Sequence, residues 1–457
     1  MAEKTNLRNL LNDAARRSIA YREDASTRPV APSPAAVRET RQFVEPLPDQ
    51  GSDDQDVLAM LDRVGSPATV SMVGPRYFGF VIGGSLPVTV ASNWLSTAWD
   101  QNVGMHEITP ATSTLEQVAM DWLLELFGLP DDAAASFVTG ATVANFTALA
   151  AARNRVFANV GWNVEADGLI GAPPVTIIVS EETHPTVFKS LGMLGFGRNR
   201  VVRAPVDTEG RIDAKRFPAI DGPTIVCTQA GNVNTGAFDP VADICELAKP
   251  KNAWVHVDGA FGLWAAASPD RSYLCAGLEA ADSWATDAHK WLNVPYDSGI
   301  AFVRDAAALQ SAMAIKADYL MTETEFRNPS DFTPELSRRA RGVDVWAALK
   351  SLGRQGIAEM IDRCCRLARR FADGLRSAGY DVLNDVVLNQ VLVSFGDDAT
   401  NRKIIARIQE EGTCWCGVTV WQRKTAMRIS VCNWSTTEDD VDRSLAAILA
   451  IARREIA

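Results

Sequence analysis

Lys290 is the residue of this sequence best placed for covalent chemistry. It stands in the segment DAHKW (287–291), directly after an apolar, β-rich run, and a short loop then leads to the next such run. In open α/β folds, ligands bind at the carboxyl ends of the strands. A lysine amine held there can form an imine with a carbonyl compound, whereas a lysine without partners is usually a solvated surface charge. The neighbouring residues decide between these two interpretations.

Two further residues, Asp258 and His184, follow other apolar runs. Asp258 ends the run WVHVD (254–258), where a buried carboxylate needs a cationic or hydrogen-bonding partner. It is either a turn aspartate or the partner of a pyridinium nitrogen, which a carboxylate keeps protonated so that the ring withdraws electrons. His184 precedes Pro185 and is either an ordinary loop histidine or an imidazole that stacks on a cofactor ring. Together with the lysine, these residues favour a cofactor site.

The segment SFVTGATVANFTALAAARN (136–154) predicts a strand that turns through residues 139–142 into a helix. The first turn of such a helix offers free backbone N–H groups and a favourable dipole to a phosphate. A plain strand-to-helix turn fits the local sequence equally well. The segment is therefore a candidate phosphate site whose support comes only from its occurrence together with Lys290, Asp258 and His184.

Short apolar runs alternate with helical patterns between residues 90 and 310. The runs lie at 175–180, 201–206, 224–229, 254–258, 283–287 and 299–304. This alternation predicts an α/β fold with a mostly parallel, doubly wound sheet. The remaining sequence predicts a helical N-terminal segment (1–90) that packs on a partner subunit, a large cofactor-binding domain (91–345) and a small α+β C-terminal domain (346–457).

The helix boundaries are predicted from capping patterns. Ser113-x-x-Glu116 has the form of a capping box, and Gly128 is placed to end the helix that follows it. Ser435-x-x-Glu438 predicts the start of the closing helix in the same way.

Composition limits the class of protein. A chain of 457 residues is long enough for two or three structural units, and its net charge of −11 opposes binding to nucleic acid. No apolar stretch approaches the roughly 18–20 residues of a membrane span, and the N-terminus lacks a signal-peptide core, so we expect no membrane association and a cytoplasmic location. The eight cysteines and four histidines lack metal-ligand spacing, so no metal site is predicted.

Several segments together resemble the group II pyridoxal-phosphate decarboxylases, the fold-type I family of aromatic amino-acid and glutamate decarboxylases. Their counterparts occur in matching order at PRYFGF (75–80), TLEQVAMDWLLELFGLP (114–130), GNVNTGAFDP (231–240), HVDGAFG (256–262), DAHKW (287–291) and MRISVCN (427–433). The resemblance implies a homodimeric lyase of amino-acid metabolism, with its active site near the subunit interface. It would use pyridoxal 5′-phosphate (PLP) to convert an L-amino acid into an amine and CO2 through an external aldimine.

The resemblance also implies roles for individual residues. Lys290 resembles the lysine that forms the Schiff base, Asp258 the partner of the pyridine nitrogen and His184 the stacking histidine, which is also a candidate proton donor. The other implied cofactor contacts are Ala260 against the ring, the phosphate-binding residues Gly140, Ala141, Thr142 and His289, and Asn232. Arg428 resembles the arginine that binds the substrate carboxylate, although a surface ion pair is its alternative. The candidates for the substrate side-chain pocket are Phe80, Ser85 and His106, each with a core or interface role as the alternative.

Two departures from the family pattern bear on the reaction. Relatives often carry asparagine where this chain has Asp287, and a carboxylate cannot donate a hydrogen bond to phosphate, so Asp287 is expected to face elsewhere or to orient a neighbour. The stretch 321–337 lacks the loop tyrosine that protonates the carbanion in animal and plant relatives. It contains Phe326 and Phe332, and Tyr319 just before it is a possible displaced acid. An oxidative aldehyde synthase or a carbon–carbon lyase on the same cofactor therefore stays open as an alternative.

Overall fold

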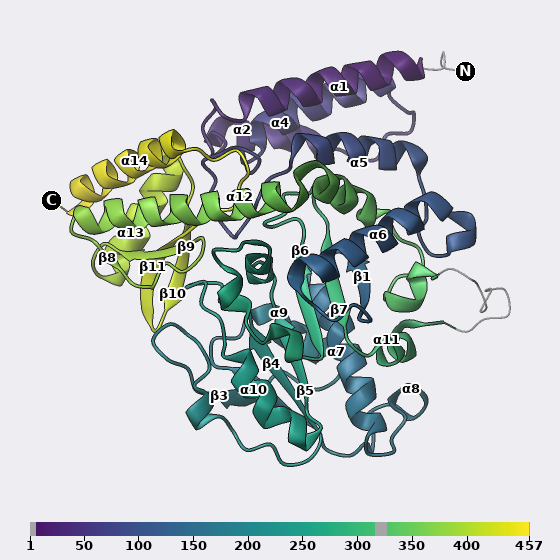
Figure 1. The fold of residues 1–457 in the computed structure, drawn as a ribbon. Coiled ribbons are helices and arrows are strands. Elements are labelled where there is room, and N and C mark those ends of the chain that lie inside the picture. The colour runs from purple at the N-terminus through teal and green to yellow at the C-terminus, as the bar shows by residue number, and fades with distance from the viewer. Residues whose placement is uncertain (1–5, 316–326, 457) are drawn as a thin grey trace.

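The computed structural model of the protein describes residues 6–315 and 327–456 (Figure 1). Its centre is a seven-stranded sheet with the order β1-β7-β6-β5-β4-β2-β3. In that order the strands span Ala134–Val138, Gly299–Val303, Ser283–Asp287, Trp254–Asp258, Thr224–Gln229, Thr176–Ser180 and Val202–Ala204. Strands β6, β5, β4, β2 and β3 pair in parallel, and β7 runs antiparallel to both β6 and β1. The predicted mostly parallel sheet is confirmed.

Helices cover both faces of this sheet. Along β4, Ile225 and Cys227 belong to one hydrophobic cluster and Val226 to another, because successive strand side chains point to opposite faces. The helices that contribute to the first cluster are α7 (Ala141–Ala158), α9 (Pro185–Met193) and α11 (Ala306–Met313), and a short helix α8 (Val164–Asp167) follows α7. The helices on the other face are α6 (Pro110–Phe127), α10 (Val241–Ala248) and α12 (Arg341–Ser377). The sheet is thus doubly wound, as predicted.

The C-terminal part is built on a second, four-stranded sheet in the order β10-β11-β9-β8, with every pairing antiparallel. These strands span Gly417–Trp421, Lys424–Ser430, Gln390–Ser394 and Asp381–Val382, and the helices beside them are α13 (Asp398–Glu411) and α14 (Glu438–Ile456). Helix α12 connects this part to the large sheet and is interrupted at Gly353, where φ is 59°. The boundary predicted between residues 345 and 346 falls inside α12.

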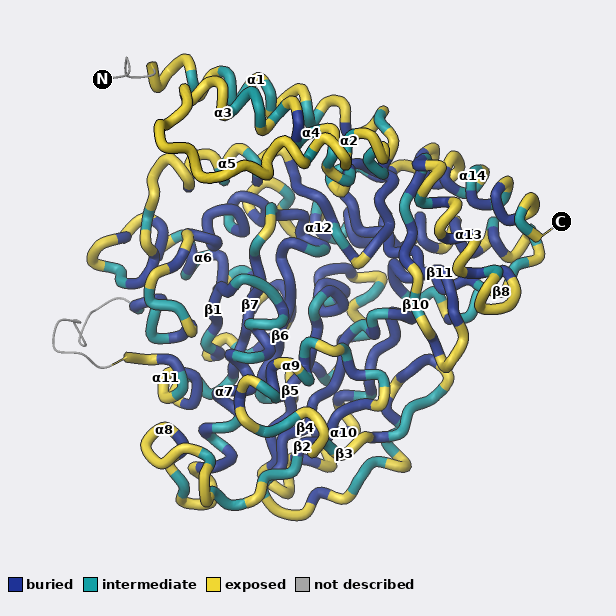
Figure 2. The backbone as a smooth tube through the Cα atoms, turned by 180° about the vertical axis from the view of Figure 1, so that it is seen from behind, coloured by how far each residue is buried: buried dark blue, intermediate teal, exposed yellow. Residues whose placement is uncertain are grey.

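The N-terminal part is helical, and Figure 2 shows much of it as exposed. Its helices are α1 (Leu7–Asp24), α2 (Pro34–Glu39), α3 (Asp54–Met60), α4 (Ser66–Ala68) and α5 (Pro87–Trp99). Helix α1 has no buried residue. In the described residues, no helix combines the length and apolarity needed to cross a membrane.

Both predicted capping boxes are wrong, while the predicted stop at Gly128 is confirmed by its left-handed conformation. Helix α6 begins at Pro110, one turn before the predicted cap, because proline is well suited to the first helical position. Ser113 therefore lies inside the helix, where its hydroxyl donates to the carbonyl of Thr109. At α14 the reciprocal bonds join residues 437 and 440: the backbone N–H of each donates to the other's side-chain oxygen.

A buried ion pair ties α6 to the segment before α12. Arg338 donates to both carboxylate oxygens of Glu116 at 2.9 and 2.8 Å, and the two side chains are 0% and 1% exposed. We expect Glu116→Gln to lower the free energy of unfolding by about 3–5 kcal/mol, because it leaves a buried guanidinium without its counter-charge. Denaturant unfolding measures this change. The matched control is Glu359→Gln, which removes the exposed pair with Arg363 and should change stability by less than about 1 kcal/mol; equal effects of both variants would contradict the prediction.

Candidate active site

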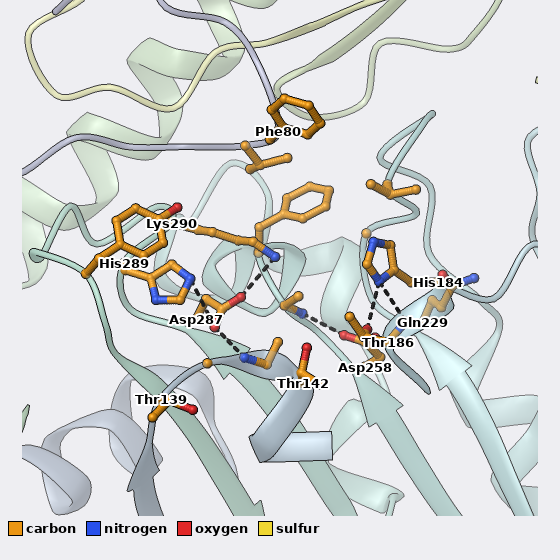
Figure 3. Close-up of a pocket in the computed structure, with 18 of the residues that line it drawn as sticks. Phe80, Thr139, Thr142, His184, Thr186, Gln229, Asp258, Asp287, His289 and Lys290 are labelled. Carbon is orange, nitrogen blue, oxygen red and sulfur yellow. Dashed lines mark hydrogen bonds and ion pairs between the residues drawn. The ribbon is translucent and has the colours of Figure 1, made fainter. Parts of the chain in front are cut away.

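A cavity of about 410 Å³ lies where β4, β5 and β6 end and α7 begins (Figure 3). Most of the residues singled out from the sequence line it. These are Lys290, Asp258, His184, Ala260, Gly140, Ala141, Thr142, His289, Arg428 and Phe80. They come from segments far apart in the chain, so the fold brings together what the sequence only suggested.

Three residues singled out from the sequence are not among those that line the cavity. Ser85 accepts a hydrogen bond from Arg22 at 2.9 Å. His106 begins a short 3-10 turn, His106–Ile108. Asn232 uses its side-chain oxygen to accept backbone N–H groups within its own turn. Their positions give no support to roles in binding cofactor or substrate.

A chain of hydrogen bonds supports Asp258 from beneath the cavity. Trp254 Nε1 donates to Ser283 Oγ (2.9 Å), which contacts His256 Nδ1 (2.9 Å). His256 Nε2 contacts Asn145 Oδ1 (2.8 Å), and Asn145 Nδ2 donates to Asp258 Oδ2 (3.1 Å). Because the Asn145 amide oxygen can only accept, His256 must be the Nε2–H tautomer and every donor in the chain points toward the carboxylate. Burial lowers the pKa of His256 to about 3, so this direction holds at neutral pH.

Asp258 is only 3% exposed and its other oxygen accepts the backbone N–H of Ala260 at 3.1 Å. Two hydrogen-bond donors thus hold the carboxylate in place. A buried anion that faces a cavity is suited to hold a cationic ring nitrogen there.

His184 caps the N-terminus of α9, where its Nδ1 lies 2.7 Å from the Thr186 hydroxyl and accepts the Thr186 backbone N–H at 3.3 Å. Burial lowers its pKa, although the charge of Asp258 acts in the opposite direction. The imidazole is therefore neutral at physiological pH and fixed in orientation. A neutral, oriented ring in the cavity wall is suited to stack on an aromatic cofactor.

The start of α7 forms a narrow cradle. A Cβ added at Gly140 would lie 3.2 Å from His289 Cε1, and one added at Gly299 would lie 2.4 Å from the backbone of Gly140. Glycine at both positions lets the turn approach β7 closely. Ala141 and Thr142 at the start of α7 line the cavity, and a helix N-terminus there suits a phosphate.

Lys290 stands on the loop 288–298 between β6 and β7. The backbone N–H groups of Ala288 and His289 donate to the carbonyl of Ser298 at 3.0 and 3.2 Å, and Asp287 pairs with Gly299 where the two strands meet. The lysine thus sits on a loop that is closed at its base by main-chain hydrogen bonds.

Asp287 faces into the site. Its Oδ1 accepts the backbone N–H of Ala141 at 2.6 Å and lies 3.5 Å from His289 Nε2, while its Oδ2 lies 2.9 Å from Lys290 Nζ. Of the two expectations for Asp287, an outward position is wrong and an orienting role toward its neighbours fits. The Asp287 carboxylate thus accepts a hydrogen bond from the Ala141 N–H, the same donor that a bound phosphate would use.

We expect Asp287→Asn to tighten PLP binding by roughly tenfold, because it removes a negative charge that competes with the phosphate for the Ala141 N–H. Equilibrium dialysis of PLP against the cofactor-free proteins measures the difference. Asp297→Asn is the matched control: it removes a carboxylate of the loop that follows Asp287, where Asp297 pairs with Arg341 outside the cavity. Weaker PLP binding by Asp287→Asn would contradict the competition.

Other lining residues were not found from the sequence. Tyr296 stacks on His289 with ring centroids 4.2 Å apart. Gln229 ends β4 and also lines the cavity.

Arg428, which was predicted, is 9% exposed and donates to the carbonyl of Val233 at 3.0 Å. Burial lowers its pKa to about 10, so Arg428 stays cationic at neutral pH.

The segment 321–337, which lacks the family's loop tyrosine, lies partly outside the described residues. Tyr319 and Phe326 belong to the segment 316–326, whose structure is not described. Phe332 is buried in the 3-10 turn Pro329–Phe332 and packs under the guanidinium of Arg327, 4.0 Å from the ring centroid. Phe332 is a core residue rather than part of the cavity wall.

The cavity fits PLP in its donor set and in its shape. An amine, an anion beneath, a neutral imidazole in the wall and a glycine cradle at a helix N-terminus surround the same space. They match the carbonyl, the ring nitrogen, the ring face and the phosphate of that cofactor.

Comparisons with known proteins point the same way. The model of the pyridoxal-dependent decarboxylase conserved domain matches residues 38–396. An aromatic-L-amino-acid decarboxylase from Bacillus atrophaeus is 27% identical over 90% of this chain and 88% of its own length. An L-2,4-diaminobutyrate decarboxylase from Rhizobium meliloti (strain 1021) is 28% identical over 90% of this chain and 84% of its own length.

Solved structures share the whole fold. The TDC of Oryza sativa, solved with PLP and tryptamine, aligns over 100% of both chains with a TM-score of 0.91 at 22% identity. A 4-hydroxyphenylacetaldehyde synthase of Rhodiola rosea aligns over 100% of both chains with a TM-score of 0.86 at 20% identity. The chain therefore belongs to the pyridoxal-dependent decarboxylase family, has the fold-type I architecture, and is a PLP-dependent carboxy-lyase of amino-acid metabolism.

Proposed function

We propose that this enzyme converts an L-amino acid with a bulky apolar or aromatic side chain into the amine and CO2, with Lys290, Asp258 and His184 as its central residues. The observation that carries the proposal is the convergence of the Lys290 amine, the Asp258 carboxylate and the N-terminus of α7 on one cavity. Bound there, PLP supplies the electron sink for cleavage of the bond to the carboxylate.

The protein's own groups supply position and charge. Asp258, held by Asn145 and the Ala260 N–H, provides a fixed negative charge beneath the ring site. Lys290 provides the covalent attachment and afterwards a nearby amine that can carry a proton. His184 has Nδ1 engaged with Thr186, so Nε2 is the ring nitrogen suited to move a proton at the substrate carbon.

The substrate class follows from the cavity wall. Phe80, Val81, Val233 and Phe261 make much of the lining apolar. Arg428 is the only arginine among the described residues that line the cavity, and it suits the substrate carboxylate. A bulky apolar side chain can contact the wall without leaving a charge unpaired. The relatives include both an aromatic-L-amino-acid decarboxylase and an L-2,4-diaminobutyrate decarboxylase, so the cavity wall rather than the kinship supports this choice.

Product analysis tests the proposal. The PLP-loaded protein is incubated with each common amino acid, and amine, CO2, aldehyde and hydrogen peroxide are measured. We expect amine and CO2 in equal amounts from phenylalanine, tyrosine or tryptophan. Turnover of only acidic or basic amino acids would overturn the substrate class, and no turnover of any amino acid would overturn the proposed substrate altogether.

A second candidate is oxidative release of an aldehyde. The observation in its favour is the absence of tyrosine from 321–337, and a solved aldehyde synthase has the same fold. This reaction would consume O2 and yield aldehyde, ammonia, CO2 and hydrogen peroxide. Peroxide in proportion to CO2 would establish it in place of simple decarboxylation.

We also propose that the protein is a cytoplasmic homodimer in which residues 1–90 pack on the partner subunit. Leu7, Leu11 and Ile19 on α1 are each at least half exposed, and Trp94 and Leu95 on α5 are also exposed. A run of exposed apolar side chains of this kind is typical of a surface that another chain covers. Light scattering should give twice the chain mass of 49.5 kDa, and a monomer at micromolar concentration would contradict the proposal.

A further inference from the structure

Gln229 carries a buried donor that has no partner in the described part of the chain. The residue is 3% exposed, its Nε2 atom makes no hydrogen bond there, and the side chain lines the cavity beside Asp258 and His184 (Figure 3). Buried amide groups are nearly always hydrogen-bonded, since an unsatisfied donor is costly. A bound molecule with an acceptor at this point would explain why the cost is tolerated.

The main chain holds Gln229 firmly in place. Its backbone N–H donates to Asp239 Oδ2 at 2.7 Å, and its carbonyl accepts the N–H of Asp239 at 3.0 Å. In the sheet, Gln229 pairs in register with Asp258 on the neighbouring strand. The backbone of Gln229 is therefore fixed beside that of Asp258, and its side chain is buried rather than exposed at the cavity rim.

The order of the strands indicates which acceptor it meets. Asp258 on β5 lies between Asp287 on β6 and Gln229 on β4. The α7 N-terminus is on the β6 side, because Ala141 N–H contacts Asp287. In PLP the phosphate arm and the phenolic oxygen lie on opposite sides of the line from the ring nitrogen to the carbonyl carbon. With the nitrogen at Asp258 and the phosphate at α7, the phenolic oxygen is on the β4 side.

We propose that Gln229 donates a hydrogen bond from Nε2 to the phenolic oxygen of PLP and so sets the charge on that oxygen. The proposal rests on PLP as cofactor and on Lys290 as its attachment, not on the identity of the amino acid. The phenolic oxygen also attracts the proton on the nitrogen that joins Lys290 to the cofactor. A second donor competes for this oxygen, so Gln229 makes that nitrogen lose its proton at lower pH.

The sequence had directed attention to a different amide. Asn232 also has a side-chain nitrogen without a partner in the described residues, but it does not line the cavity. The distinction between the two amides comes only from the structure, and the proposal replaces Asn232 by Gln229 as the cofactor contact.

The test is a pH titration of the visible absorption band of the PLP-loaded protein, together with the equilibrium dissociation constant of PLP. Gln229→Met keeps the size and the apolar stem of the side chain and removes the donor. We expect the pKa of the band to rise by roughly one unit and PLP to bind about tenfold more weakly, the effect of one lost hydrogen bond. Gln229→Glu should also raise this pKa, because an ionised carboxylate cannot donate.

Thr228→Val is the matched control. It removes a buried polar group from the same strand, where Thr228 donates to the His256 carbonyl, and it does not touch the cavity. Its titration should match that of the unaltered protein. Circular dichroism shows whether each variant is folded. If Gln229→Met does not fold, the titration of Gln229→Glu tests the proposal instead.

Two results separate the possible failures. Folded Gln229 variants that titrate and bind PLP like the unaltered protein would overturn the role of Gln229 and leave the proposed function intact. An unaltered protein that forms no visible band with PLP would instead overturn the cofactor attachment on which both depend.

Discussion

Lys290→Ala should remove the covalent attachment of PLP and reduce the rate of decarboxylation by about 10²–10⁴-fold, the range expected when a positioned proton-transfer group is lost. Among the described residues that line the cavity, Lys290 is the only lysine, and its Nζ lies 2.9 Å from Asp287 Oδ2. Borohydride reduction followed by peptide mapping should label Lys290 in the unaltered protein.

Lys215→Ala provides the control, because this lysine is exposed and lies outside the cavity. It should keep both the label and the activity. A Lys290→Ala protein that is still labelled at a single site would show that another lysine holds the cofactor and would refute the central assignment.

Asp258→Asn should lower kcat by about 10²–10³-fold, the typical loss when one preorganised electrostatic contact is removed. The new side chain has nearly the same shape but no charge, so the ring nitrogen loses the anion that favours its protonated form. One of its two polar atoms would also be a donor, which would face a donor from Asn145 or from the Ala260 N–H.

Asp282→Asn is the matched control for this substitution. Asp282 is a partly buried carboxylate that also accepts a backbone N–H, from Val255 at 2.8 Å, but it lies at the opposite end of the strands from the cavity. We expect Asp282→Asn to affect stability and to leave kcat nearly unchanged. Similar kcat values for Asp258→Asn and the unaltered enzyme would show that the carboxylate does not act on the cofactor.

Much of the fold could be predicted from local patterns. Strands β2 to β7 are short apolar runs, and all of them except the edge strand β3 are largely buried, which makes such runs visible in a sequence. Lys290, Asp258 and His184 were found because each directly follows such a run. The starts of α6 and α14 were misplaced because several nearby hydroxyl and carboxyl side chains could serve as caps, and only the folded chain selects among them.

The supporting residues could not be predicted because their roles depend on packing between distant segments. Asn145 lies one turn into α7 and meets Asp258 only because α7 crosses under β5. Gln229 ends β4 and Asn232 follows three residues later, and only the folded structure shows which of these two amides lines the cavity. Ser85 is close in sequence to the motif at 75–80, yet its hydroxyl is taken by Arg22 of the N-terminal helix.

The closed loop that carries Lys290 has a consequence for how the enzyme handles its cofactor. Its base is formed by Asp287 and Gly299 of two fully buried strands, so the amide protons of β6 and β7 should exchange with solvent only when the whole sheet unfolds. The backbone of the lysine is thus positioned by the core and not by PLP. The protein can release its cofactor and recover it with the attachment point already in register, so the amides of this hairpin should stay protected from deuterium exchange in the cofactor-free protein.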